Sequence, residues 1–182
     1  MDEALIRSNV SNGARALVSI ALDLQEDEPG FEDQRLRLLE IYSGIIGTSA
    51  RPYPGIELLL EALAVRGIGW GISTNKPRAY TEPLLERLAI KPAPGSVVCP
   101  DDVKERKPHP ESLYRNCKDL GCAPHEAVYV GDHLRDIEAG RRGGMCTIAA
   151  AYGYIEDHDD PASWRADHIV EHSTELQALI LP

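Results

Sequence analysis

Short apolar segments alternate with amphipathic helical segments along residues 51–182, and this alternation restricts the possible fold more than any other feature of the chain. The predicted strands cover residues 68–73, 96–99, 127–130, 146–151 and 168–171. The predicted helices cover residues 56–66, 78–88, 110–120 and 133–142, and a further helix follows Ser173, which is a suitable N-cap residue. Strands that are joined through helices form right-handed βαβ units and a parallel sheet with helices on both faces. The sequence therefore predicts a doubly wound, Rossmann-like α/β fold.

The first fifty residues have a different pattern. Residues 5–24 and 31–46 have helical periodicity, and Pro29-Gly30 separates these two segments. The sequence Arg51-Pro52-Tyr53-Pro54-Gly55 marks a boundary to the alternating region. We therefore expect a small helical module over residues 1–50 and an α/β core over residues 51–182.

Composition excludes several classes of protein. The net charge of −10 argues against sequence-independent binding to nucleic acid, which depends on basic residues. No apolar run reaches transmembrane length, and the first residues do not resemble a signal peptide. The cysteines at positions 99, 117, 122 and 146 lack CxxC spacing, which indicates reduced thiols and a cytoplasmic protein.

Polar residues follow two of the predicted strands, at the edge of an open α/β sheet where ligands usually bind. Asp132 follows strand 127–130, and one helical turn would bring Asp136 back toward it. Two neighbouring carboxylates repel each other unless a cation or donors intervene, and Mg²⁺ binds to such groups together with phosphate. A simpler interpretation is that Asp132 caps the following helix.

Thr74, Asn75 and Lys107 are candidates for binding an anion. Thr74 and Asn75 follow strand 68–73, where a hydroxyl and the amides of a helix N-terminus would favour negative charge. Lys107 lies in a proline-rich loop and would place a compact positive charge against a phosphate. The simpler interpretations are an ordinary helix start and a solvated loop lysine.

The order of these motifs resembles that of the haloacid dehalogenase superfamily. The chain has Thr-Asn-Lys-Pro at 74–77, Lys-Pro-His-Pro-Glu at 107–111 and Gly-Asp-x-x-x-Asp at 131–136. Further similarity covers 98–103, 135–141 and 151–155, and is typical of phosphoglycolate phosphatases and related enzymes that dephosphorylate N-acetylmuramic acid 6-phosphate. Residues 1–50 are similar to the mobile cap of that family.

The resemblance implies a role for each matching residue. Thr74 and Asn75 would bind the transferring phosphoryl group of a small phosphorylated metabolite, and Lys107 would neutralise its charge. Asp132 would be a ligand of a Mg²⁺ cofactor, with Asp136 supporting the metal directly or through water. In the cap, we single out Arg15 as a possible contact for a substrate carboxylate, although a solvated helix arginine is the simpler interpretation. The resemblance does not define the oligomeric state.

The family nucleophile is an aspartate in an Asp-x-Asp-Gly-Thr motif at the end of the first, central strand. The sequence lacks this motif, and we interpret Asp23 in Leu22-Asp23-Leu24 as an ordinary helix-end residue. We therefore expect a core without its first strand and an incomplete cap. Two explanations remain: a longer gene that begins upstream, or a shortened relative without catalysis. The corresponding functions are a phosphatase and a non-catalytic phosphometabolite-binding protein, and a haloacid dehalogenase is a third possibility.

Overall fold

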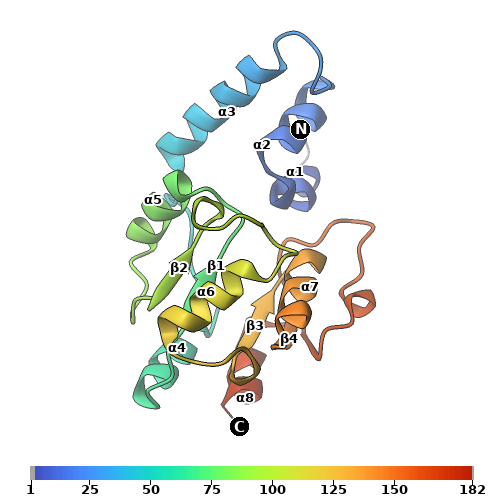
Figure 1. The fold of residues 1–182 in the computed structure, drawn as a ribbon. Helices are drawn as coiled ribbons and strands as arrows, with labels where there is room; N and C mark the ends of the chain where they lie inside the picture. Colours follow the sequence, from blue (N-terminus) through green and yellow to red (C-terminus); the bar gives the residue numbers. More distant parts are fainter. Residues whose placement is uncertain (1–2, 182) are drawn as a thin grey trace.

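The computed structural model describes residues 3–181, which form a helical module above the strand ends of an α/β core (Figure 1). The module contains α1 (Glu3–Asn9), α2 (Gly13–Leu22) and α3 (Phe31–Ile45). The helices of the core are α4 (Ile56–Val65), α5 (Arg78–Leu88), α6 (Glu111–Leu120), α7 (Leu134–Gly143) and α8 (Leu176–Ile180). Its strands are β1 (Gly71–Ser73), β2 (Ser96–Val98), β3 (Val128–Gly131), β4 (Cys146–Ala150) and β5 (His168–Val170).

All strands pair in parallel, which confirms the predicted fold class. The strands nevertheless form two separate sheets and not one continuous sheet. β1 pairs with β2, and β3, β4 and β5 form a second sheet in that order. In the part of the chain that the structure describes, no ladder of hydrogen bonds joins β1 to β3. We call this interruption the sheet break. The family resemblance implies a central strand between these two strands, and the absence of that strand stays a prediction.

The main apolar cluster lies on the face of the sheets that α4 and α8 cover. Leu59, Leu60 and Leu63 of α4 pack there with Ile148 and Val170 from the second sheet, and all five are at most 6% exposed. The half-buried Trp70 and Val130, from opposite sides of the sheet break, pack against the same cluster. Burying a leucine contributes roughly 1.5–3 kcal/mol. This cluster therefore holds the two sheets together despite the break.

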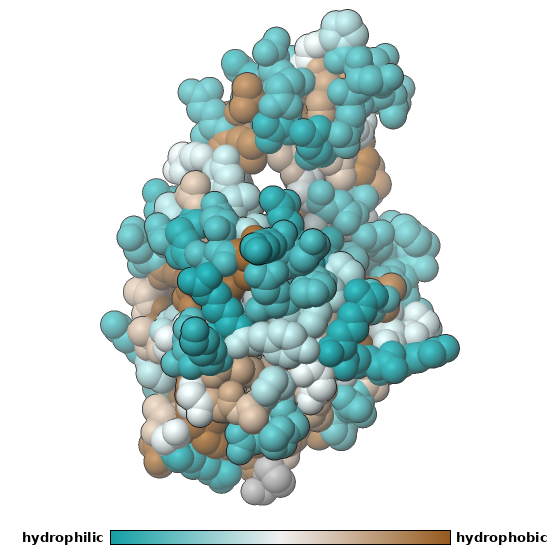
Figure 2. Space-filling model, in the orientation of Figure 1, coloured by the Kyte–Doolittle hydropathy of each residue, from teal (hydrophilic) through white to brown (hydrophobic). Residues whose placement is uncertain are grey.

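The helical module contacts the core on both sides of the sheet break. Lys76, just beyond β1, donates to the Tyr42 hydroxyl of α3 at 2.7 Å. On the other side, Arg135 of α7 donates to the Ser11 carbonyl at 2.7 Å. The Arg7 guanidinium lies 4.6 Å from the centroid of the Tyr154 ring. The space-filling view shows the module as a separate lobe with apolar residues between its helices (Figure 2).

Some local expectations are wrong. Residues 5–24 do not form one helix, because a 3-10 turn at Val10–Asn12 ends α1 and Gly13 has a φ of 81°. Ser173 does not cap α8, because its hydroxyl donates to the Pro54 carbonyl at 2.7 Å and a 3-10 turn at Ser173–Glu175 precedes the helix. Among residues 3–181, no helix combines the length and apolarity that a bilayer crossing requires.

Close packing of α7 on the second sheet predicts a difference between two glycine substitutions. A Cβ at Gly140 would lie 2.5 Å from the Thr147 methyl carbon, whereas a Cβ at Gly44 of α3 would meet no atom within 4 Å. We expect Gly140→Ala to lower the free energy of unfolding by about 1–3 kcal/mol. Gly44→Ala should leave it unchanged or raise it by up to about 1 kcal/mol. Urea unfolding measures both, and equal effects would contradict the packing.

Candidate active site

Lys107 connects the two sheets at the carboxyl ends of their strands. Its ammonium group lies 2.8 Å from each of three oxygens: the Ser73 carbonyl of β1, the Tyr129 hydroxyl of β3 and Oδ1 of Asp136 on α7. The Lys107 side chain is only 7% exposed. The alternative of a solvated loop lysine is therefore wrong, and the three protons of the ammonium each have an acceptor.

The surroundings keep this lysine charged. Burial alone would lower the pKa of the Lys107 ammonium, but the nearby Tyr129 and Asp136 oxygens outweigh burial, and the net pKa is raised. Burial raises the pKa of Tyr129 to about 12, so its phenol is neutral at physiological pH. The site thus combines a buried ion pair of Lys107 and Asp136 with a neutral phenol beside it.

Asp136 reaches Lys107 because Gly131 leaves room for it. A Cβ at position 131 would lie 2.2 Å from the Asp136 Cβ, so only glycine at the end of β3 allows this approach. The Asp136 side chain is 9% exposed. The first turn of α7 therefore brings the Asp136 carboxylate to Lys107. The expectation that Asp136 and Asp132 share one metal site stays a prediction.

Asp132 faces the loop after β4. Its Oδ2 accepts the Tyr154 backbone N–H at 3.0 Å, and a Cβ on Gly153 would lie 2.2 Å from its own Cβ. The N-cap of α7 is His133, whose side chain accepts the N–H of Arg135. The alternative of Asp132 as the helix cap is therefore wrong, which leaves its carboxylate for another purpose.

Thr74 and Asn75 form the loop between β1 and α5. The Thr74 N–H donates to the Val98 carbonyl at 3.0 Å, and its hydroxyl accepts the Lys76 N–H at 3.0 Å. The Asn75 amide donates to the Lys107 carbonyl at 3.2 Å. Since α5 begins at Arg78, Thr74 and Asn75 precede the helix by several residues rather than forming its first turn. Asn75 is nevertheless fixed beside the Lys107 backbone.

Arg15 forms no hydrogen bond or ion pair with Thr74, Asn75 or Lys107 and is instead paired within the helical module. It lies on α2 and forms an ion pair with Glu26 of the same module at 2.6 Å, with its side chain 54% exposed. That position fits the simpler interpretation of a solvated helix arginine. A contact between Arg15 and a substrate stays a prediction.

Of the two aspartates at this site, Asp132 offers the less engaged carboxylate for a metal. Asp136 Oδ1 is engaged by Lys107, whereas Asp132 has only the Tyr154 N–H on one of its oxygens. Within residues 3–181, no group of three or more His, Cys, Asp or Glu side chains is arranged to hold a metal. Mg²⁺ binds through one or two carboxylates plus substrate phosphate, so Asp132 fits such a ligand. Direct ligation by Asp136 stays a prediction.

Tyr129 and the backbone of Gly153-Tyr154 complete the site, and sequence reasoning missed them. Tyr129 occupies an apolar position in β3, where only the alternation of side chains indicates the face that it occupies. The Tyr154 N–H meets Asp132 across 22 positions of the chain. Nothing in the local sequence indicates such a contact, because it depends on the path of the loop after β4.

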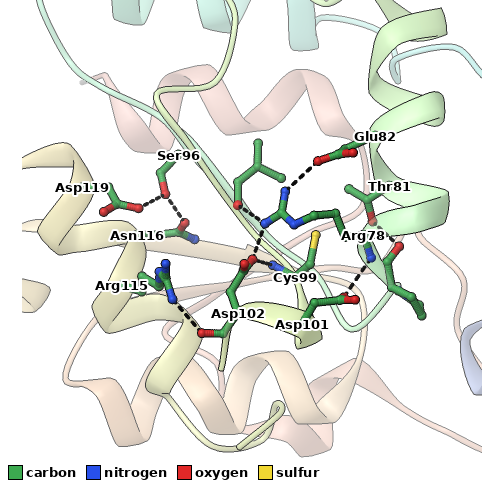
Figure 3. A network of polar contacts seen from close by, with 12 residues as sticks. Arg78, Thr81, Glu82, Ser96, Cys99, Asp101, Asp102, Arg115, Asn116 and Asp119 are labelled. Atoms are coloured by element: carbon green, nitrogen blue, oxygen red, sulfur yellow. Dashed lines mark hydrogen bonds and ion pairs between the residues drawn. The ribbon is translucent and has the colours of Figure 1, made fainter. Parts of the chain in front are cut away.

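A second polar network fixes the loop after β2 to the start of α5 (Figure 3). Arg78 forms an ion pair with Asp102, whose carboxylate also accepts the Cys99 N–H at 2.8 Å. Asp101 accepts the Arg78 N–H at 2.9 Å, and Arg115 of α6 donates to the Asp102 carbonyl at 2.6 Å. These contacts hold the start of α5, and with it the loop that contains Thr74 and Asn75.

This network predicts a pH-dependent stability. Burial would raise the pKa of the Asp102 carboxyl, but the Cys99 N–H and Arg78 outweigh burial, and the net pKa is below its usual 3.8. Because this pKa is lower in the folded state than in the unfolded state, the ionised carboxylate stabilises the fold above pH 3.8. That stabilisation is lost as the pH falls through the pKa of the folded state. We expect Asp102→Asn to lower stability by about 1–3 kcal/mol at pH 7. Urea unfolding should show the difference shrinking below pH 3.8, and a constant difference would contradict this origin.

The buried ion pair predicts a large cost for removing one partner. Lys107→Met would leave the Asp136 carboxylate buried without its cation, which costs about 3–5 kcal/mol of unfolding free energy. The double variant Lys107→Met/Asp136→Asn should recover much of this loss, because the amide carries no charge. Arg15→Met breaks an exposed pair as a control and should cost under about 1 kcal/mol. Equal losses in Lys107→Met and Arg15→Met would contradict the burial of the pair.

Comparisons with known proteins agree with this geometry. The family model of haloacid dehalogenase-like hydrolases matches residues 14–150. N-acetylmuramic acid 6-phosphate phosphatase from Pseudomonas aeruginosa is 44% identical over 97% of this chain and 78% of its own length. Phosphoglycolate phosphatase from Xanthomonas campestris is 38% identical over 95% of this chain and 78% of its own length. A crystal structure of a predicted phosphoglycolate phosphatase from Haemophilus somnus has a TM-score of 0.85 at 25% identity, covering 98% of this chain and 82% of its own.

The chain belongs to the haloacid dehalogenase-like hydrolase family. Within that family, its relatives make it a hydrolase of the phosphoric monoester type. The resemblance inferred from residues 74–77, 107–111 and 131–136 is thus confirmed.

Proposed function

We propose that this site serves the hydrolysis of a small phosphorylated metabolite that carries a carboxylate, such as phosphoglycolate or the 6-phosphate of a sugar acid. The buried Lys107 ammonium at the carboxyl ends of β1 and β3 is the observation that carries the proposal. A positive charge with little surrounding water stabilises the charge on phosphoryl oxygens better than a solvated one does. The names of the two relatives at 38% and 44% identity support this substrate class.

Each residue has a distinct task in this proposal. Lys107 neutralises the transferring phosphoryl group, and Thr74 and Asn75 bind its oxygens from the loop after β1. Asp136 holds the Lys107 ammonium in place. Asp132 would be the ligand of a Mg²⁺ ion, which supplies further positive charge to the phosphoryl oxygens when it is bound. We also propose a cytoplasmic location, in line with the free cysteines.

The nucleophile is the part that the sequence does not supply. The family resemblance implies an aspartate that attacks phosphorus and forms an aspartyl-phosphate, which water then hydrolyses. No Asp-x-Asp-Gly-Thr motif occurs in the 182 residues, and Asp136 is the carboxylate that Lys107 contacts in the described part of the chain. We therefore propose that turnover requires a strand that contributes this aspartate at the sheet break.

The buried Lys107, together with the missing nucleophile motif, favours a second candidate function: a protein that binds a phosphorylated metabolite without hydrolysing it. Lys107 and its three oxygen partners do not depend on a nucleophile for their positions. Such a protein would use the charge of Lys107 to hold the phosphate and would release it unchanged.

An activity assay distinguishes the two candidates. We expect the 182-residue chain to show no turnover of phosphoglycolate, N-acetylmuramic acid 6-phosphate or an aryl phosphate, since removing the nucleophile of a hydrolase has cost about 2 × 10⁶ in kcat. A chain extended at its N-terminus by a strand ending in Asp-x-Asp-Gly-Thr should release phosphate in the presence of Mg²⁺. Phosphate release is measured colorimetrically.

Two variants of the extended chain serve as controls. Asp132→Asn should lower turnover by at least a hundredfold and weaken the dependence of turnover on Mg²⁺. Arg15→Met tests only whether the helical module contributes to turnover through this residue. Turnover by the 182-residue chain that Asp132→Asn abolishes would overturn the assignment of the nucleophile. An extended chain that binds phosphate but never hydrolyses an ester would favour the binding protein.

A further inference from the structure

Lys76 lies between the helical module and the loop after β1. Its ammonium donates to the Tyr42 hydroxyl of α3 at 2.7 Å and lies 4.7 Å from the centroid of the same ring. Tyr80 of α5 stands beside Tyr42, with the two ring centroids 5.8 Å apart. Lys76 is half-buried. It therefore places a positive charge in aromatic surroundings at the boundary between the module and the core.

No acidic side chain balances this charge. Among residues 3–181, Lys76 forms no ion pair, and the Tyr42 hydroxyl is the one acceptor of its ammonium. An ammonium has three protons to donate, so Lys76 has protons left for a ligand. The face of an aromatic ring attracts a cation but does not neutralise its charge. Because less water surrounds a half-buried cation, it attracts an anion more strongly than an exposed lysine does.

The loop after β1 places Lys76 next to the residues that are proposed to bind the phosphoryl group. The Lys76 N–H donates to the Thr74 hydroxyl at 3.0 Å, and the Asn75 amide donates to the Lys107 carbonyl at 3.2 Å. Consecutive Cα atoms lie about 3.8 Å apart. Asn75 thus faces Lys107 on the core, whereas the next side chain along the loop faces the module. Lys76 is therefore the cation that the phosphoryl-binding loop directs toward the module.

The boundary between the module and the core has room for a small ligand. Figure 2 shows an opening between the lobe of the module and the core. The contact of Lys76 with Tyr42 lies on the β1 side of the sheet break, and the contact of Arg135 with the Ser11 carbonyl lies on the α7 side. A ligand at this boundary would have its phosphoryl group against the strand ends and its other end against the module. A side chain that reaches from the core to the module is suited to bind that other end.

Two arginines of the module are engaged elsewhere. Arg15 forms its ion pair with Glu26 within the module, and its side chain is 54% exposed. The Arg7 guanidinium lies over the ring of Tyr154, in the loop after β4. Neither arginine forms a hydrogen bond or ion pair with the loop after β1. The position of Lys76 therefore fits a substrate carboxylate better than the position of Arg15 does.

We propose that Lys76 determines substrate specificity by binding the carboxylate of the substrate, while Lys107 and Thr74 hold the phosphoryl group. The proposal rests on the proposed function, since it assigns the second charged group of that substrate class. Tyr42 is a positioning residue, because its hydroxyl directs the Lys76 ammonium. A carboxylate accepts a charge-assisted hydrogen bond from an ammonium, whereas a neutral amide in its place accepts a weaker one. The site thus selects phosphate monoesters that carry a carboxylate.

Isothermal titration calorimetry of the 182-residue chain tests the proposal with three ligands: inorganic phosphate, phosphoglycolate and the amide of phosphoglycolate. The amide has nearly the same shape as phosphoglycolate but lacks the carboxylate charge. At an ionic strength of about 0.15 M, phosphoglycolate should bind about tenfold more tightly than its amide. Lys76→Met should reduce this ratio to about threefold or less, because the charge-assisted hydrogen bond is lost. Its affinity for inorganic phosphate, which Lys107 still binds, should change by less than about threefold, since salt screens charges that do not touch the ligand.

Three further variants separate the effects of charge and position. Lys76→Arg keeps the charge and should retain a ratio of about fivefold or more. Lys118→Met makes the same change in net charge at an exposed lysine in the last turn of α6, and should leave the ratio unchanged. Tyr42→Phe keeps the ring but removes the acceptor of the Lys76 ammonium. It should lower the ratio by about two- to fivefold, because a lysine that is not held loses more rotamer freedom on binding.

The outcomes separate the role of Lys76 from the proposed function. Equal affinity of the native chain for phosphoglycolate and its amide would overturn only the role of Lys76, and so would an unchanged ratio in Lys76→Met. A ratio that is lost in Arg15→Met or Arg7→Met but kept in Lys76→Met would overturn it in favour of the module. An unchanged ratio in Tyr42→Phe would overturn the positioning role of that hydroxyl. A chain that binds none of the three ligands would overturn the proposed function itself. Should Lys76→Met fail to fold, Lys76→Gln takes its place.

Discussion

The contact between Lys107 and its three oxygen partners is the interaction on which the rest of the site depends. It joins β1, β3 and α7 at a place where no backbone ladder joins them. Removing a lysine and an aspartate from water is costly, and a buried pair is stabilising only with good geometry and further hydrogen bonds. The Ser73 carbonyl and the Tyr129 hydroxyl supply those bonds. The pair therefore fixes positions more than it adds stability.

Glycines decide how closely the acidic groups approach the strand ends. Gly131 lets Asp136 fold back beneath β3, and Gly153 lets Asp132 lie against the loop after β4. A side chain at either position would displace a carboxylate from the place where a phosphate is expected. The two aspartates consequently differ in surroundings: one is buried with Lys107, and the other keeps an oxygen available for a ligand.

Most of the fold could be predicted from the sequence, because the alternation of apolar strands and helices is a local pattern. The four-residue spacing placed Asp136 in the first turn of the helix that follows Asp132, but it did not indicate that Lys107 would be its partner. The burial of Lys107 was not predictable from its loop, since burial depends on Tyr129 and Asp136 from elements far along the chain. Similarly, the helical periodicity of residues 5–24 did not predict the positive φ of Gly13, because periodicity describes the spacing of apolar side chains and not backbone dihedral angles.

The division of the sheet has a consequence for the order of folding. Gly71 pairs with Ser96, Val128 with Cys146 and Ile148 with His168, so among residues 3–181 no strand pairing spans more than 25 positions. Closing such short loops costs little conformational entropy, and folds that are dominated by local pairing form quickly. Each half-sheet can assemble from its own stretch of chain before the two meet. The two half-sheets then meet through the apolar cluster of α4 and not through strand pairing.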